Sequence, residues 1–135
     1  VQDELVNRIV NNLGQNNIVV VHTSRVLQEF DGFSDDSLDA ELTKDKLAGM
    51  ITDFLAELTK RVTEAKQLIL IVIGGETSYK CCCAINACQL QLIDEAAPAI
   101  ALSLDHNAQW IVTKSGNLGG ANTLIDILKY FENHE

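Results

Sequence analysis

The sequence predicts a single-domain α/β fold, a three-layer structure in which helices cover both faces of a mostly parallel sheet. Two aliphatic runs, 18–21 and 68–73, contain no polar residue, which is typical of strands buried on both faces of a parallel sheet. A segment with apolar residues at steps of three and four lies between them, as a crossover helix does. The length of 135 residues suits one domain with one hydrophobic core.

The composition restricts the classes of partner. The formal net charge is -9, and a field of that sign repels nucleic acid and anionic membranes. No segment reaches the roughly 18 consecutive apolar residues that a membrane-spanning helix needs. Three of the four cysteines are adjacent, unlike the spaced cysteines of a secreted disulfide framework. We therefore expect a reduced, cytoplasmic protein that binds neither nucleic acid nor membrane.

The beginning of the chain predicts a helix followed by a strand. Apolar residues recur at helical spacing over 5–13, and Gly14 is placed to end that helix. The aliphatic run 18–21 then predicts a central strand. Polar residues follow it, including His22 and Arg25, and we interpret these two as turn residues rather than ligand contacts.

The next part of the chain predicts an acidic loop and a long helix. Residues 29–41 contain four aspartates, but their spacing does not match a calcium-binding loop, so we interpret them as solvated. From Lys44 to Ala65, apolar residues recur at steps of three and four. This pattern predicts an amphipathic helix with one face on the sheet, leading into the aliphatic strand 68–73.

That strand ends in the sequence GGETS, residues 74–78, which opens a helix-compatible segment. Adjacent glycines permit a sharp turn and leave no Cβ in the path of a ligand. We expect Thr77 or Ser78 to cap the helix, whose first N–H groups and dipole favour an anion. Glu76 would repel a bare phosphate, so we expect it to reach a ribose hydroxyl, a metal-bound water or a backbone amide. A tight turn without a ligand is the alternative for this loop taken alone.

The segment after the first glycine loop predicts a helix and two short strands. Cys81 and Cys88 share one helical face with apolar residues, so we interpret them as small buried residues rather than metal ligands. Residues 89–92 alternate in polarity and predict a strand with one wetter face, and 99–102 predict another. His106 lies in an expected turn, and we do not assign it to catalysis.

The end of the chain repeats the pattern of strand, glycine loop and helix. The strand 110–113 is followed by KSGNLGG, residues 114–120, and by a helix over 121–133. If the strands 68–73 and 110–113 are parallel neighbours, both loops emerge at one sheet edge, where open α/β folds bind ligands. Lys114 adds a positive charge that suits phosphate. The sequence therefore predicts that the two loops together hold a phosphate-bearing ligand, a nucleotide. The residues expected on the buried face of the last helix are Leu124, Ile125, Leu128 and Phe131.

These motifs carry a family resemblance. GGETS after an aliphatic strand, followed later by IVTKSGNLGG (111–120), resembles the C-terminal nucleotide-binding domain of the four-carbon acid sugar kinases. IVVVHTSR (18–25) is similar to the strand that leads into that domain's core, and the resemblance spans most of the chain. Leu118 stands where the family more often carries phenylalanine. The resemblance implies a transferase of carbohydrate metabolism that phosphorylates threonate, erythronate and their 3-oxo relatives.

The resemblance also implies the ligand and its site. The ligand would be ATP, with Mg²⁺ brought in by the nucleotide. Its phosphates or ribose would lie at the first loop, and the second loop would form the opposite wall of the site. The candidate cofactor-binding residues are Gly74, Gly75, Glu76, Thr77, Ser78, Lys114, Ser115, Gly116, Asn117 and Gly119. We predict no catalytic residue and no metal ligand of the protein's own.

Two parts of the family pattern have no counterpart in these residues: the substrate domain with its Asp-Asp-x-Thr-Gly-type loop, and a Gly-Ser-rich segment that also touches ATP. Phosphoryl transfer needs a positioned nucleophile and usually a base beside it. We therefore expect residues 1–135 to be the nucleotide-binding domain, a C-terminal fragment of a two-domain kinase, inactive without its substrate domain. The alternatives are a stand-alone module that binds a nucleotide or another anion without catalysis, and a purely structural assembly fragment. A truncated domain exposes apolar surface, so we also expect a homodimer.

Overall fold

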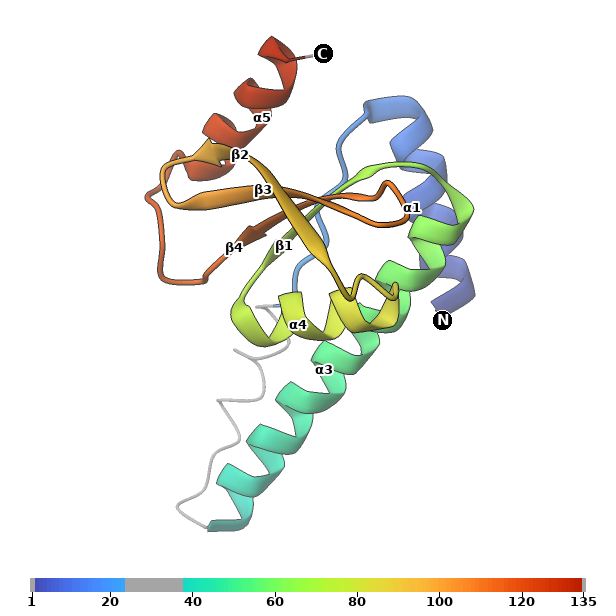
Figure 1. Ribbon diagram of the computed structural model, residues 1–135. Helices are drawn as coiled ribbons and strands as arrows, with labels where there is room; N and C mark the ends of the chain where they lie inside the picture. The colour runs from blue at the N-terminus through green and yellow to red at the C-terminus, as the bar shows by residue number, and fades with distance from the viewer. Residues whose placement is uncertain (1, 24–37, 135) are drawn as a thin grey trace.

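A computed structural model of the protein describes residues 2–23 and 38–134, without the side chains of 38–43 (Figure 1). The elements in chain order are α1 (Gln2–Asn16), α3 (Leu38–Ala65), β1 (Ile69–Ile73), α4 (Gly75–Ala84), β2 (Leu90–Ala97), β3 (Ile100–Asp105), β4 (Trp110–Lys114) and α5 (Thr123–Asn133). No helix within the described ranges is long and apolar enough to cross a membrane. The long predicted helix is confirmed, and it begins earlier than expected, inside the acidic stretch.

The strands form one four-stranded sheet in the order β1-β4-β3-β2. β1 and β4 are parallel, whereas β3 is antiparallel to both β4 and β2. The α/β class is confirmed, but the expectation of a mostly parallel sheet is wrong, because this sheet is mixed. The sheet is mixed because the connections between its later strands are short. Pro98 and Ala99 alone join β2 to β3, and residues 106–109 join β3 to β4. A parallel pair needs a crossover of roughly a dozen residues or more, so these strands can only form hairpins.

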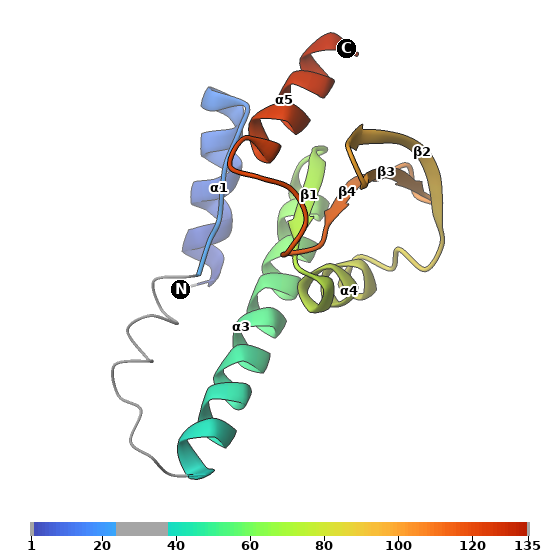
Figure 2. The same ribbon diagram turned by 90° about the vertical axis from the view of Figure 1, so that its left-hand side faces the viewer.

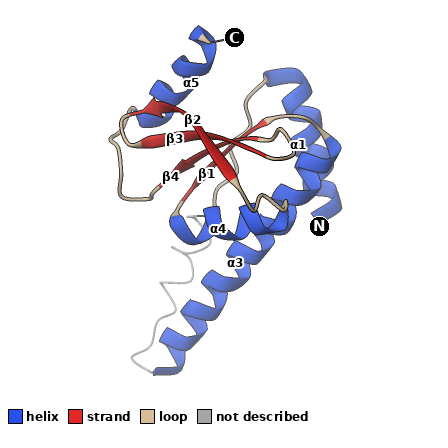
Figure 3. Ribbon diagram, viewed as in Figure 1, coloured by secondary structure: helices blue, strands red, loops and turns tan. Residues whose placement is uncertain are grey.

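Helices cover both faces of the sheet, as predicted (Figures 1 and 3). On one face, Ile127 of α5 is fully buried in a cluster that includes Val112, with Ile71 packed against it. On the other face, Val72 of β1 packs with Cys81 of α4 and with α3. Because neighbouring residues of a strand point to opposite faces, Ile71 and Val72 place α5 on one side and α3 and α4 on the other.

A second hydrophobic cluster joins α1 to the C-terminal half of α3 (Figure 2). Its buried members are Val6, Ile9, Leu58 and Val62. Leu68, just before β1, packs against the same cluster. The N-terminal half of α3 projects away from the sheet. The predicted first helix is therefore confirmed, and it stabilises α3 on the side that leads into β1. The expectation that Gly14 ends this helix is wrong, because α1 continues to Asn16 and the positive φ of 64° follows at Asn17.

The strand predicted at 18–21 is wrong, because this segment joins no sheet in the described structure. Only Val19 packs against the cluster between α1 and α3, whereas Ile18 and Val21 are exposed and Val20 is 71% exposed. The predicted crossover from this run to β1 is therefore absent among the described residues. Arg25 and most of the acidic stretch lie outside the described residues, so their interpretations stay predictions.

The final helix buries a face that matches the prediction only in part, since Leu128 and Phe131 are half-buried. Leu124 and Ile125 are exposed, whereas Ile127 is fully buried and Phe131 packs against the same core. The apolar residues of this segment are too closely spaced to define one helical stripe, so several faces fit the pattern. The core beside β2 and β3 selects the face that carries Ile127.

Candidate functional site

The two glycine loops lie at the same edge of the sheet. β1 and β4 run parallel and in register, with Ile73 opposite Lys114. The first residue after β1, Gly74, donates its N–H to the Lys114 carbonyl at 2.8 Å. This confirms the predicted geometry, in which the two strands point the same way and their glycine-rich ends adjoin (Figure 1).

The first loop passes directly into α4 without a side-chain cap. Gly74 is the N-cap residue, with a φ of 105° and a ψ of 137°, and no side chain hydrogen-bonds to this end of the helix. The expected cap by Thr77 or Ser78 is wrong, because both lie inside the first turn. The Ser78 N–H instead donates to the Gly74 carbonyl at 2.9 Å, which closes that turn. The N–H groups of Gly75, Glu76 and Thr77 are therefore available to a ligand.

The two glycines of the first loop have different roles. Gly74 has a backbone conformation that residues with a Cβ rarely adopt, so the turn itself requires glycine there. Gly75 has a negative φ and is exposed, and a Cβ added to it would meet nothing within 4 Å. Gly75 thus leaves open surface beside the uncapped N–H groups of α4.

The second loop contains a turn before its helix begins. The Leu118 N–H donates to the Ser115 carbonyl at 3.2 Å, and Gly119 follows with a φ of 90°. A Cβ at Gly119 would collide with the side chain of Thr123. The hydroxyl oxygen of Thr123, at the start of α5, accepts the Gly120 N–H at 2.7 Å. This hydrogen bond fixes the end of the loop to the helix that follows it.

The other predicted residues of the second loop lie exposed between β4 and Gly119. Ser115, Gly116 and Asn117 belong to this group. Lys114, the last residue of β4, is half-buried, and its Nζ donates to the Ser115 carbonyl at 3.0 Å. Its positive charge is therefore held at the end of β4, close to the backbone junction with the first loop.

Both glycine loops lead into helix N-termini that carry no side-chain cap. Asn122, the N-cap residue of α5, makes no side-chain hydrogen bond to the helix, as Gly74 makes none to α4. Free N–H groups and the positive end of the helix dipole favour an anion at such a position. The end of the sheet where β1 and β4 adjoin can therefore attract a phosphate through the backbone N–H groups of α4, with Lys114 beside it.

Sequence reasoning missed an ion-pair network on α4. The Nζ of Lys80 lies 2.6 Å from Oδ1 of Asp53 on α3 and 3.9 Å from Oε1 of Glu76. The hydrogen bond that Lys80 donates to Asp53 raises the pKa of Lys80, and the nearby Glu76 charge raises it further. The spacing of four residues between Glu76 and Lys80 was the available signal. Asp53 could not be found from spacing, because it lies on another helix.

A second missed feature is the β2–β3 hairpin. Ala101 pairs with Thr113, so the turn at Pro98 and Ala99 lies at the same end of the sheet as the glycine loops. Ala99 has a φ of 62°, and its N–H donates to the side chain of Glu95. The two-residue connection between the strands was the signal that could have predicted this hairpin.

The other turn of the sheet lies at the opposite end. Asp105 is buried, and its Oδ1 accepts the N–H groups of Asn107 at 2.9 Å and Gln109 at 2.7 Å. His106 lies exposed in this turn, which confirms its interpretation as a turn residue. Asp105 stabilises the turn between β3 and β4 and is far along the sheet from Lys114.

The cysteines in and just after α4 differ in burial, and only Cys81 is fully buried. Cys81 is buried against α3, with its sulfur 3.4 Å from Oγ1 of Thr59, which confirms its packing role. Burial raises the pKa of the Cys81 thiol. Cys83 is exposed, and Cys88 is exposed beyond the end of α4, so the prediction that Cys88 shares the buried face is wrong.

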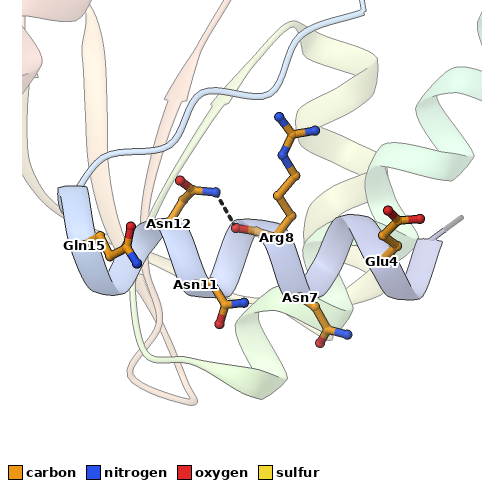
Figure 4. A pocket seen from close by; sticks show the side chains of 6 residues that line it. All are labelled: Glu4, Asn7, Arg8, Asn11, Asn12 and Gln15. Atoms are coloured by element: carbon orange, nitrogen blue, oxygen red, sulfur yellow. Dashed lines mark hydrogen bonds between the residues drawn. The ribbon is translucent and has the colours of Figure 1, made fainter.

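A pocket of about 430 Å³ lies on α1, away from the glycine loops (Figure 4). It is lined by the polar side chains Glu4, Asn7, Arg8, Asn11, Asn12 and Gln15. The side-chain amide of Asn12 donates to the Arg8 carbonyl at 2.7 Å. All six residues come from the solvent-facing side of one helix and none comes from a strand end, so we assign no ligand to this pocket.

Comparison with known proteins identifies the family. Residues 1–124 match the family described as the nucleotide-binding C-terminal domain. The chain belongs to this family. The match confirms the resemblance predicted from GGETS and the second glycine loop, and it places both loops within a nucleotide-binding domain. No match was found among curated proteins.

Solved structures share the fold. A Bordetella bronchiseptica protein of the DUF1537 family, a domain-swapped dimer with bound citrate, is 25% identical over 58% of this chain and 21% of its own, with a TM-score of 0.54. A Haemophilus influenzae protein of the same family is 17% identical over 98% of this chain and 30% of its own, with a TM-score of 0.67. A candidate tRNA synthase from Salmonella typhimurium LT2 is 16% identical over 92% of this chain and 31% of its own, with a TM-score of 0.63. The chain thus spans less than a third of the length of each.

Proposed function

We propose that the chain is the ATP-binding domain of a four-carbon sugar-acid kinase, which binds ATP with Mg²⁺ and has no kinase activity by itself. One observation carries the proposal: the hydrogen bond from the Gly74 N–H to the Lys114 carbonyl joins the two glycine loops at one edge of the sheet. Two helix N-termini without side-chain caps begin at these loops. The match to a nucleotide-binding family supports the same interpretation.

The residues present fit the phosphates of a nucleotide. The N–H groups of Gly75, Glu76 and Thr77 would bind phosphate oxygens over the open surface at Gly75. Lys114 and Ser115 would form the opposite wall. Within the described ranges, no three His, Cys, Asp or Glu side chains are grouped to hold a metal ion, so Mg²⁺ would be held mainly by the phosphates. ATP, when bound, supplies the transferable phosphoryl group.

The transfer itself requires more than the residues of this site. A sugar-acid hydroxyl must be positioned against the phosphorus, usually with a base beside it. None of the candidate site residues is a histidine or an aspartate. The carboxylate of Glu76, in the first turn of α4, lies 3.9 Å from the Nζ of Lys80. We infer that a separate substrate domain supplies the acceptor site and the base. The small share of the solved chains that this chain spans supports that inference.

Isothermal titration of the protein with ATP and Mg²⁺ tests the nucleotide site. We expect measurable binding at millimolar ATP that Gly75→Val abolishes, because its side chain would fill the surface above the α4 N–H groups. Gly49→Val is the matched control, since Gly49 lies on α3 and a Cβ there also meets nothing within 4 Å. Circular dichroism of both variants should match the wild type. Undetectable ATP binding by the wild type would contradict the proposal.

An activity measurement separates the two parts of the proposal. Incubation of the protein with ATP, Mg²⁺ and threonate or erythronate should release no ADP above the background. Addition of a substrate domain of this family should produce ADP only when the wild-type chain, and not Gly75→Val, is present. Binding of ATP without any gain on adding that domain would favour a stand-alone nucleotide-binding module.

We further propose that the chain forms a homodimer at high concentration. Ile69 and Ile73 are exposed on β1, which pairs only with β4 among the described strands, and Val20 is also exposed. An unpaired apolar strand edge favours association with another chain. The Bordetella bronchiseptica relative is a domain-swapped dimer. Light scattering should show a dimer that Ile69→Lys weakens, and a monomer at all concentrations would contradict the proposal.

A further inference from the structure

The helix behind the first glycine loop carries an acidic residue where an anion would bind. Glu76 lies in the first turn of α4, next to the N–H groups that no side chain caps. Its side chain is 67% exposed and therefore has room to move. A carboxylate in the first turn is attracted to the same N–H groups and to the same end of the helix dipole as a phosphate. Glu76 thus competes with an anionic ligand and also repels it.

Lys80 restrains this carboxylate. It lies one turn after Glu76 on the same side of α4, and its Nζ is 3.9 Å from Oε1 of Glu76. This ion pair holds the Glu76 carboxylate near the Lys80 ammonium group, and no side-chain cap hydrogen bond joins it to the N-terminus of α4. The positive charge of Lys80 also offsets the negative charge of Glu76 at the distance where a phosphate would sit.

Lys80 is itself held in place by α3. Its Nζ lies 2.6 Å from Oδ1 of Asp53, and the Lys80 side chain is only 29% exposed, compared with 70% for Asp53. Beneath this contact, Ala56 of α3 and Cys81 of α4 pack in one buried cluster with Val72. The Lys80 ammonium group is therefore held against α3, the helix on which α4 packs.

We propose that Lys80 is a positioning residue for the nucleotide phosphates, which holds the Glu76 carboxylate away from the N-terminal amides of α4. This inference rests on the proposed nucleotide site. It extends that proposal by naming a residue outside both glycine loops that sets the affinity for the anionic part of the ligand. In a chain with a net charge of -9, such local compensation favours an anion that the overall field disfavours.

The test compares ligands that differ in the number of phosphates. ATP, ADP, AMP and adenosine are titrated into the wild type, Lys80→Met, Glu76→Gln and the double variant Lys80→Met/Glu76→Gln. Lys129→Met is the matched control, because Lys129 is an exposed residue of α5 and its loss changes the net charge equally. Lys80→Arg retains the positive charge. Thermal unfolding of each variant checks that it is folded.

We expect Lys80→Met to weaken ATP binding roughly fivefold, ADP binding less, and adenosine binding not at all, because only the phosphates sense the freed carboxylate. Glu76→Gln in the Lys80→Met background should restore ATP affinity, and Lys80→Arg and Lys129→Met should bind ATP as the wild type does. An equal loss for ATP and adenosine would mean that Lys80 only stabilises α4, and unchanged ATP affinity or a failed rescue would also overturn the inference. A wild type that binds no ATP would overturn the proposed function itself.

Discussion

The loop after β1 passes directly into α4, whereas the loop after β4 contains a turn before α5 begins. In the first loop, Gly74 adopts a positive φ and acts as the N-cap, and its N–H bonds to the end of β4. In the second loop, Gly119 adopts a positive φ, and Thr123 holds the loop to the helix through the Gly120 N–H. The first loop is therefore fixed by the sheet, and the second by its own helix.

The glycines of the two loops have two different roles. Some are required by the backbone conformation, and others leave open surface. Gly74 and Gly119 have positive φ values, and Gly119 also lies against Thr123. Gly75 and Gly120 have neither constraint, since a Cβ at either position meets nothing within 4 Å. Substitutions at the first pair should change stability, whereas substitutions at the second pair should leave the fold intact.

The largest loss of stability is expected for Gly119→Ala. The new Cβ would collide with the Thr123 side chain in a backbone conformation that alanine rarely adopts, which together cost about 3 kcal/mol. Urea unfolding with an unchanged m-value measures the loss. The control Gly120→Ala should stay within about 0.5 kcal/mol of the wild type. Equal effects of the two variants would show that Gly119 is no more constrained than its neighbour.

Gly74→Ala should destabilise the protein by about 2 kcal/mol, because its φ and ψ lie in a region that is almost confined to glycine. The effect is smaller than at Gly119, since the nearest atom to a Cβ at Gly74 is Oγ1 of Thr77, at 3.6 Å. Gly75→Ala, one residue later in α4, should be neutral or stabilising by about 0.5 kcal/mol. If Gly75→Ala is the more destabilising variant, the assignment of the two glycines is reversed.

Threonines distinguish how the two helices begin. Thr123→Ala removes the acceptor of the Gly120 N–H and should cost about 1 kcal/mol, whereas Thr123→Ser keeps the hydroxyl and should recover part of the loss. Thr77→Ala, in the first turn of α4, removes no cap and should cost less in the same urea experiment. A cost at Thr77 equal to that at Thr123 would indicate that α4 is capped after all.

The smallest expected effect is on the local opening of α4, which can be followed by chemical labelling of its buried cysteine. Cys81 is buried and its pKa is raised, so at neutral pH its thiol should react with iodoacetamide much more slowly than those of Cys83 and Cys88. Labelling of Cys81 should increase as the pH rises, because the reactive thiolate forms only above its raised pKa. Gly74→Ala should speed this labelling by loosening the start of α4, and Gly119→Ala should do so less. Mass spectrometry of the labelled peptides measures both rates.

Local signals in the sequence were sufficient for the parallel pair and its loops. Val72 in the aliphatic run before Gly74 and Val112 in the strand before Lys114 are buried against helices, as their composition predicts, whereas Ile69 and Ile73 at the ends of β1 are exposed. The hairpins were also signalled, by connections too short for a parallel crossover, and the expectation of a mostly parallel sheet overlooked this. The aliphatic run 18–21 led to a wrong prediction of a strand. A strand requires a neighbour to pair with, and no local pattern specifies one.

Other features depend on contacts between distant residues. Asp53 and Lys80 meet because α3 and α4 pack side by side, and neither residue is unusual in its local sequence. The buried face of α5 is selected by the core around Ile127, while the neighbouring Leu124 and Ile125 satisfy the same apolar pattern and stay exposed. Helical periodicity specifies a set of possible faces, and only the packed structure selects one.

The order of the elements has a consequence for the way the site forms. β1 and β4 are adjacent in the sheet, yet α4, β2 and β3 lie between them in the chain. The two glycine loops therefore adjoin only through a contact between distant parts of the chain, and a ligand that bridges the loops binds the chain in which β1 and β4 are paired. Such a ligand raises the free energy of unfolding by about 2.7 kcal/mol at a hundred times its dissociation constant. A rise in the melting temperature would thus report binding to the folded chain.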